Sequence, residues 1–181
     1  MRRSVTTYYL QMLSAQELRP AQPPSLAVEI RRAEIPCPQL NRFLYTAVGG
    51  DWYWVDRLPW TYAQWQAYLE RPELETWVAF AAATPVGYFE LERQPQSQTE
   101  IAYFGLLPQF IGKGIGGWLL TAAVQRAWET GARRVWVHTC TLDGPAALRN
   151  YLSRGFQLYR EETTEVELPD QPPGPWQGAY R

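Results

Sequence analysis

The sequence predicts an α/β (α+β) protein in which one mixed β-sheet carries helices on both faces. Of its 181 residues, 46% are hydrophobic. A chain of this length can bury about 70% of the surface that it exposes when unfolded. Three strand-like runs follow one another in the middle of the chain with short separations, which is typical of an antiparallel meander. The last third alternates helix-like and strand-like segments, which places helices against the sheet.

The N-terminal residues 1–35 form a β extension of two extended segments joined by a proline-rich connector. A short helix is expected over residues 39–47, and a stronger one over residues 61–70. Thr61 and Gln64 begin the second helix with the spacing of a capping box. The segment between the two helices is rich in aromatic residues: Trp52, Tyr53, Trp54 and Trp60.

The meander comprises residues 76–83, 86–93 and 100–107, which carry β-branched and aromatic residues. Thr84, Pro85 and Gly87 are expected to make the tight turn between the first two strands. A proline and a polar loop mark the other boundaries of the meander.

A strong helix follows the glycine-rich segment 112–117, because apolar residues then recur at helical spacing as far as Ala127. Residues 134–141 are apolar and rich in β-formers, so they predict a strand. Pro145 fits the first position of the next helix, which Gly155 ends. Residues 156–168 are a final extended run. We therefore expect one domain over residues 1–168 and an irregular tail over residues 169–181.

The composition excludes several classes of function. Cys37 and Cys140 are the only cysteines and His138 is the only histidine, so neither a disulfide framework nor a His-rich metal site is expected. His138 and Cys140 are interpreted as structural residues. The net charge of −1 and a pI of about 5.9 argue against a nucleic-acid partner. No apolar run is long enough to span a membrane. We expect a cytoplasmic protein without a metal.

The glycine-rich segment joins a strand to a helix, and it predicts an anion site. The first amides of a helix lack partners within the helix and lie at the positive end of its dipole. The pattern of a P-loop fails, because Lys113 is followed by glycine rather than Ser or Thr. Gly112, Gly114 and Gly117 match a dinucleotide-binding fingerprint literally. However, the required acidic residue about 20 positions later is absent, since Ala132 stands there.

A third pattern is Gln109-x-x-Gly112-x-Gly114, preceded by an apolar strand and a proline. It resembles the coenzyme A loop of the GNAT superfamily of N-acetyltransferases. A second motif, similar to a later segment of that family, is Ala147-x-x-x-Tyr151-x-x-x-Gly155-Phe156. At position 144, where the family often has asparagine, this sequence has Gly144. The resemblance implies a mostly antiparallel GNAT-like sheet in which two parallel strands splay apart.

The resemblance also implies acetyl-CoA as the cofactor, with its pantetheine between residues 100–107 and 134–141. Backbone groups of Leu106 and Leu107 would pair with the pantetheine, and an amide there would stabilise an oxyanion. Gln109 would pack or hydrogen-bond at the start of the loop. The pyrophosphate would be held by the amides of Gly112, Lys113, Gly114, Ile115, Gly116 and Gly117. Lys113, the only lysine, would also pair with a cofactor phosphate.

By the same resemblance, the protein would transfer acetyl to an amine by direct attack in a ternary complex. Glu100 begins the cofactor-carrying strand, where some family members keep a glutamate base. Glu90 and Glu92, on one face of the preceding strand, are rivals for this role. Tyr151 matches the family's tyrosine acid, which would protonate the departing thiolate.

The acceptor is expected to be a small-molecule or peptide amine, and the aromatic residues between 52 and 68 either line its pocket or belong to the core. A non-catalytic acyl-CoA-binding module of the same fold is the alternative function. A dinucleotide-binding oxidoreductase is a third possibility, for which we expect no NADH binding. The protein would be a monomer or a homodimer.

Overall fold

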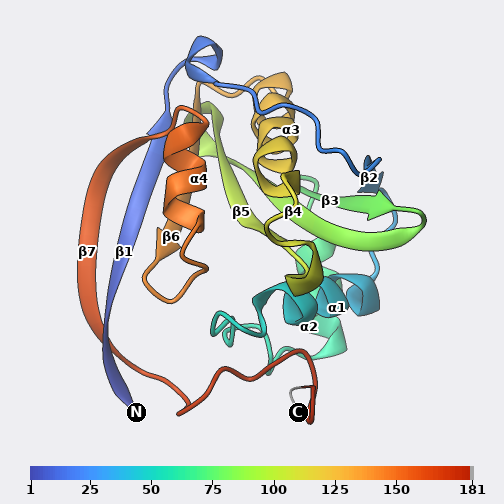
Figure 1. Ribbon diagram of the computed structural model, residues 1–181, viewed down its shortest axis with the longest axis vertical. Coiled ribbons are helices and arrows are strands. Elements are labelled where there is room, and N and C mark those ends of the chain that lie inside the picture. The colour runs from blue at the N-terminus through green and yellow to red at the C-terminus, as the bar shows by residue number, and fades with distance from the viewer. Residues whose placement is uncertain (180–181) are drawn as a thin grey trace.

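One seven-stranded sheet runs through the protein in the computed structural model, which describes residues 1–179. Across the sheet the order is β2-β3-β4-β5-β6-β1-β7 (Figure 1). Only β5 and β6 are parallel, and all other neighbours are antiparallel. The predicted mixed, mostly antiparallel sheet is therefore confirmed. The strands are β1 (Arg2–Met12), β2 (Glu29–Ala33), β3 (Leu74–Ala81), β4 (Thr84–Gln94), β5 (Gln98–Leu106), β6 (Arg134–Cys140) and β7 (Gln157–Glu167).

The first strand is an internal strand of the sheet. β1 pairs with β6 on one side and with β7 on the other, so that Tyr9 lies opposite both His138 and Arg160. Because β7 pairs with β1, the first and last strands of the chain lie side by side at one edge of the sheet, as Figure 1 shows.

Four α-helices within residues 1–179 cover the two faces of the sheet. They are α1 (Pro38–Gly49), α2 (Tyr62–Leu69), α3 (Ile115–Glu129) and α4 (Ala147–Ser153). Alternation along β3 and β4 separates the faces, since Val78 and Tyr88 pack with α1, whereas Ala79 and Phe89 pack with α3. The capping box of Thr61 begins α2 as predicted.

Two local predictions are wrong. The turn between β3 and β4 falls on Ala82 and Ala83, with φ of 46° and 62°, rather than on Thr84, Pro85 and Gly87. A two-residue hairpin loop of this kind needs positive φ at both positions, which proline cannot adopt. Pro145 lies before α4 rather than at its first position, since Ala146 is the N-cap. It occupies a turn closed by the amide of Ala147, which donates to the carbonyl of Gly144.

The described part of the chain ends without regular structure. Residues 169–179 contain no helix or strand. Residues 180 and 181, the end of the tail predicted to be irregular, lie outside the described residues. Within residues 1–179, no helix combines the length and the apolar character that crossing a membrane requires.

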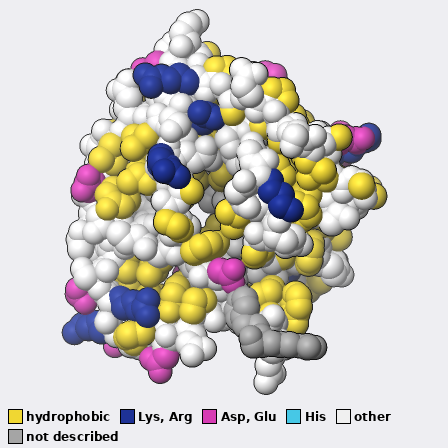
Figure 2. Space-filling model, in the orientation of Figure 1, with side chains coloured by type: hydrophobic (Ala, Val, Ile, Leu, Met, Phe, Trp, Pro, Cys, Tyr) yellow, Lys and Arg dark blue, Asp and Glu magenta, His cyan; other side chains and the backbone are white. Residues whose placement is uncertain are grey.

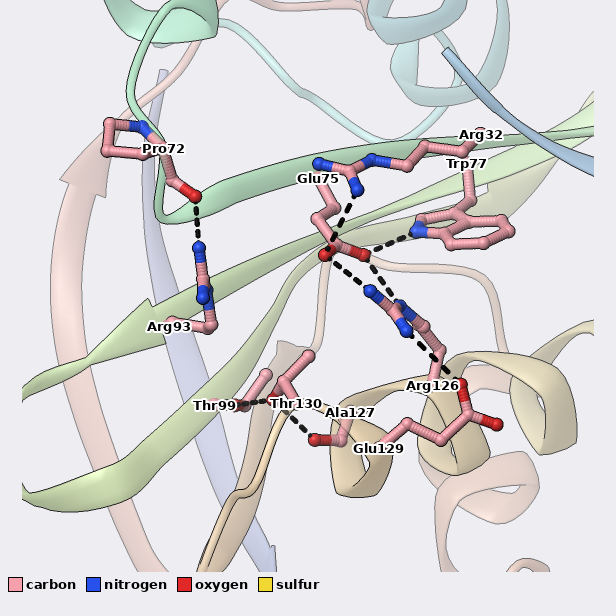
Figure 3. A network of polar contacts seen from close by, with 10 residues as sticks. All are labelled: Arg32, Pro72, Glu75, Trp77, Arg93, Thr99, Arg126, Ala127, Glu129 and Thr130. Carbon is pink, nitrogen blue, oxygen red and sulfur yellow. Dashed lines mark hydrogen bonds and ion pairs between the residues drawn. The ribbon is translucent and has the colours of Figure 1, made fainter. Parts of the chain in front are cut away.

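A buried carboxylate ties β3 to α3 (Figure 3). Arg126 donates from Nε and Nη2 to the two oxygens of Glu75 at 2.9 and 2.8 Å, and the indole of Trp77 donates to Oε2 at 2.8 Å. Arg32 lies 3.6 Å away on β2. The hydrogen bonds from Arg126 hold the pKa of Glu75 below its ordinary value, although burial opposes them. The carboxylate of Glu75 on β3 therefore links this strand to β2 through Arg32 and to α3 through Arg126.

This depressed pKa predicts a pH dependence of stability. Ionised Glu75 stabilises the folded state at pH values above the unfolded pKa near 4.5, and this contribution is lost as the pH falls through the lower, folded pKa. We expect Glu75→Gln to lower the free energy of unfolding at pH 7 by about 1–3 kcal/mol. The difference in unfolding free energy between wild type and Glu75→Gln should shrink as the pH falls below about 4.5 and through the lower pKa of folded Glu75. Urea unfolding of both proteins from pH 7 to pH 3 measures it, and a difference independent of pH would contradict the assignment.

Candidate active site

Strands β5 and β6 separate after three paired positions. The parallel pairs are Gln98–Arg134, Thr99–Val135 and Glu100–Trp136, and beyond them the two strands diverge. The gap is continuous with a cavity of about 1030 Å³, lined by both strands, the aromatic segment 52–57 and α4. Figure 2 shows this face hollowed near its centre. The two parallel strands are thus splayed, as the resemblance to the coenzyme A loop family implies.

The loop between β5 and α3 presents unused amides. Gly112 and Gly114 have φ of 82° and 75°, a conformation that glycine adopts without strain. A Cβ at either position would meet nothing within 4 Å, so the backbone conformation, rather than space, requires glycine there. Gly114 is the N-cap of α3 and no side chain caps the helix. In the described part of the chain, no amide from Gly112 to Gly117 donates a hydrogen bond to the protein. These donors lie at the positive end of the α3 dipole.

Gly117 has a different role from these two glycines. A Cβ there would lie 2.6 Å from Nη1 of Arg154 and 3.2 Å from the Cβ of Ala21. The guanidinium of Arg154 therefore passes directly over the first turn of α3. Its Nε is buried and has no hydrogen-bond partner, and Arg154 lines the cavity. A cation beside the positive end of a helix is unfavourable unless an anion joins them, so this end of the cavity is suited to a phosphate.

The predicted cofactor residues fall into two groups. Leu106, Gly112, Gly116 and Gly117 line the cavity. The others do not: Leu107, Gln109, Lys113, Gly114 and Ile115. Among these, Ile115 is a core residue whose amide alone can face a ligand, Gln109 is exposed, and the Lys113 ammonium lies 5.4 Å from the ring centre of Phe110.

The backbone of β5 offers hydrogen-bonding groups to the gap at alternate residues. The amide of Leu107 donates to the carbonyl of Val86 at 2.9 Å, so it points to β4 and is not free. Because successive peptide groups of a strand point to opposite sides, those of Leu106 and Phe104 point toward the gap. Beyond Glu100 no strand pairs with this edge of β5.

Tyr151 reaches the same cavity from α4. Its ring packs edge-on against Phe104 and Phe156, and only 5% of the residue is exposed. Burial raises the pKa of its hydroxyl well above the ordinary value, and the charge of Asp143 adds to this effect. The hydroxyl of Tyr151 is therefore neutral at physiological pH.

Two of the three predicted bases, Glu100 and Glu90, have different surroundings. Glu100 lines the cavity, and His138 Nδ1 lies 3.2 Å from its Oε1. Glu90 is fully buried outside the cavity lining, where Arg57 Nη1, the Tyr68 hydroxyl and Asn41 Nδ2 donate to it at 3.1, 2.7 and 3.2 Å. Glu90 thus already accepts three hydrogen bonds from the protein, and it has no open path to a substrate.

The segment from His138 to Pro145 follows β6 and lines the cavity along most of its length. Asp143 fixes it, since its Oδ2 accepts from the Thr139 hydroxyl and the Cys140 amide at 2.7 and 2.9 Å. Its Oδ1 accepts from the indole of Trp54 at 3.4 Å, which links this segment to the aromatic segment. Burial raises the pKa of the Cys140 thiol, so that it stays protonated and is a poor nucleophile.

Comparison with known proteins decides the family. A family model described as "Acetyltransferase (GNAT) family" matches residues 37–156, which is most of the chain. The chain belongs to the GNAT acetyltransferase family. Membership implies that this GNAT protein uses an acyl-CoA. No curated relative matches it significantly.

Several solved structures share the GNAT fold at low sequence identity. A GCN5-related N-acetyltransferase from Sphaerobacter thermophilus has a TM-score of 0.69 at 17% identity, covering 91% of this chain and 52% of that one. A GCN5-related N-acetyltransferase from Kribbella flavida has a TM-score of 0.62 at 21% identity, covering 87% of this chain and 56% of that one. An aminoglycoside acetyltransferase from an uncultured soil metagenomic sample has a TM-score of 0.59 at 21% identity, covering 70% of this chain and 86% of that one. This GNAT chain spans about half the length of the first two structures.

Sequence reasoning missed two residues of the site. His138 is interpreted from the sequence as structural, yet it is exposed to the cavity beside Glu100. The alternation of side chains along β6 could have indicated this position. Residues two apart in a strand share a face of the sheet, and His138 lies two residues after Trp136, which pairs with Glu100. Arg154 has no comparable signal, since only the packing of α4 on the start of α3 brings it to Gly117.

Proposed function

We propose that this GNAT protein transfers acetyl from acetyl-CoA to a small-molecule or peptide amine by direct attack in a ternary complex. One observation carries the proposal, namely that the unpaired edge of β5 runs directly into a row of unused amides at the start of α3. A pantetheine arm fits the first feature and a diphosphate fits the second.

The cofactor would bind along the loop and the splayed strands. Amides from Gly112 to Gly117 would hold the pyrophosphate, with Lys113 and Arg154 adding positive charge. Main-chain groups of Phe104 and Leu106 would pair with the amides of pantetheine, as a neighbouring strand would. This path directs the thioester toward Tyr151, whose hydroxyl would protonate the sulfur when the carbon–sulfur bond breaks.

The acceptor would enter from the end of the cavity that carries aromatic and acidic side chains. Tyr45, Trp54 and Tyr103 pack there with ring centres 5.0–5.5 Å apart. Five carboxylates also line the cavity: Asp56, Glu92, Glu100, Asp143 and Glu167. Negative charge and aromatic faces both attract a cationic amine with an apolar body. One similar structure is an aminoglycoside acetyltransferase, and its acceptor class is of a size that this cavity could hold.

Thermal unfolding with and without CoA tests the cofactor part of this proposal. At a CoA concentration 100 times its Kd, the free energy of unfolding should rise by about 2.7 kcal/mol. For a chain of this length that corresponds to a rise in Tm of roughly 5–10 °C. No shift at millimolar CoA would overturn the proposal.

Arg154 provides a variant for the same assay. Arg154→Gln removes the unpartnered cation over Gly117 and should reduce the CoA-dependent shift, whereas Arg133→Gln, an exposed residue outside the cavity lining, should not. Turnover then separates the enzyme from the non-catalytic alternative. A protein that CoA stabilises but that acetylates no amine of a broad panel would be an acyl-CoA-binding module.

A further inference from the structure

Both oxygens of the candidate base already have protein partners. Glu100 Oε1 lies 3.2 Å from His138 Nδ1, and Gln94 Nε2 donates to Oε2 at 2.8 Å. The Gln94 amide is itself oriented, because the indole of Trp136 donates to its carbonyl oxygen at 2.9 Å. Only 9% of Glu100 is exposed. This carboxylate is therefore held in place and is poorly placed to meet an incoming amine.

The imidazole of His138, in contrast, is open to the cavity. Its side chain is 47% exposed and lines the cavity. The rings of Tyr9 and Trp136 flank it, each with a centroid distance of 6.0 Å, and fix its orientation. With Nδ1 directed at Glu100, Nε2 is the nitrogen that remains for a ligand. An imidazole backed by a carboxylate is the arrangement of a general base with its orienting group.

We propose that His138 takes the proton from the acceptor amine, and that Glu100 is a positioning residue that orients and charges the imidazole. This inference rests on the proposed acetyltransferase function. The cationic amine first gives one proton to solvent water, its neutral nitrogen then forms a bond to the acetyl carbon, and the carbon–sulfur bond breaks. Nε2 of His138 accepts one proton from the nitrogen, and the Tyr151 hydroxyl gives one to the sulfur. The imidazolium then returns its proton through water to the tyrosinate, so that the net reaction moves one proton from nitrogen to sulfur.

The charges around His138 set the pH at which it can act. The hydrogen bond to Glu100 raises the pKa of His138 above its ordinary value, burial opposes this, and the charges of Glu100 and Asp143 add to it. Other titratable or charged groups packed nearby are Tyr9 on β1, Arg160 over the Tyr9 ring on β7, and Glu92 opposite Glu100 on β4, which pairs with Arg71. Because the base must be neutral, activity should fall as the pH drops through a value above 6.5.

The pairing can be measured without turnover, because the chain has one histidine. Protein labelled in its imidazole gives a single histidine NMR signal to follow with pH. We expect Glu100→Gln to lower the titration midpoint, since the carboxylate that stabilises the imidazolium is gone. Tyr9→Phe keeps the neighbouring ring and removes only a phenol, so its midpoint should equal that of wild type. An unchanged midpoint in Glu100→Gln would overturn the pairing.

Kinetics test the catalytic role with acetyl-CoA and tyramine or phenethylamine as probe amines. His138→Gln should lower kcat by roughly 10²–10⁴-fold and abolish the acid limb of the pH profile, with CoA-dependent stabilisation unchanged. Glu100→Gln should shift that limb to lower pH, which a merely structural carboxylate would not do. If wild type acetylates a probe amine and His138→Gln keeps both rate and limb, the inference alone fails. If wild type acetylates no amine of the broad panel, the proposed function fails and the inference falls with it.

Discussion

Glu90→Ala is expected to lower the free energy of unfolding by about 3–5 kcal/mol, because it leaves a buried guanidinium without its counter-ion. Glu90 has no exposed surface and Arg57 only 7%. Arg57 also packs against the faces of Tyr68 and Tyr103, with its guanidinium carbon 3.9 and 4.1 Å from the ring centres. Chemical denaturation at pH 7 measures the effect.

Two further variants show whether the loss comes from an unpaired charge. Replacing both partners, as Glu90→Leu with Arg57→Met, removes the charge together with its counter-ion and should recover much of the lost stability. Glu29→Ala breaks the exposed pair with Arg31 and should leave stability nearly unchanged. A Glu90→Ala protein as stable as Glu29→Ala would contradict this account of the pair. If Glu90 variants also lose activity, we would attribute the loss to displacement of Arg57 and Tyr103, which line the cavity, rather than to loss of a base.

Tyr151→Phe is expected to lower kcat by roughly 10²–10⁴-fold while leaving the affinity for CoA nearly unchanged. The substitution removes only the hydroxyl, and the ring keeps its packing against Phe104 and Phe156. Without the hydroxyl, the sulfur would have to leave as an unprotonated thiolate. Steady-state kinetics with saturating acetyl-CoA measure kcat, and the CoA-dependent rise in Tm reports binding.

The same comparison contains its control. Tyr159→Phe removes a hydroxyl from an exposed tyrosine on β7, outside the residues that line the cavity, and should leave kcat unaltered. If Tyr151→Phe has the kcat of wild type, the proton reaches the sulfur by another route, and Tyr151 is only a packing residue.

The sequence predicted best those features that depend on neighbours in the chain. The capping box at Thr61, the helix after Gly114 and the free amides of the glycine loop each follow from a few consecutive residues. The position of β1 inside the sheet does not, because its pairing with β6 joins residues more than a hundred positions apart. The turn at Ala82 and Ala83 was missed because alanine carries no turn signal, and only the two-residue hairpin imposes positive φ.

The candidate site likewise has one part that depends on neighbours in the chain and another that depends on long-range contacts. The anion loop is local, so its residues could be named from their spacing. The contact of His138 with Glu100, and that of Glu90 with Arg57, depend on which strand faces become neighbours and on how far each side chain is buried. The sequence therefore indicated several carboxylates for one role, and burial now distinguishes them. Glu90 is enclosed by donors, whereas Glu100 lies at the cavity behind an accessible imidazole.

A crystal structure of the protein with CoA tests the central claim most directly. We predict that the diphosphate lies on the amides of residues 112–117, beneath Arg154, that the pantetheine runs along Leu106 between β5 and β6, and that the sulfur lies within hydrogen-bonding reach of the Tyr151 hydroxyl. A CoA molecule bound elsewhere, with the gap between these strands closed by side chains, would contradict the account.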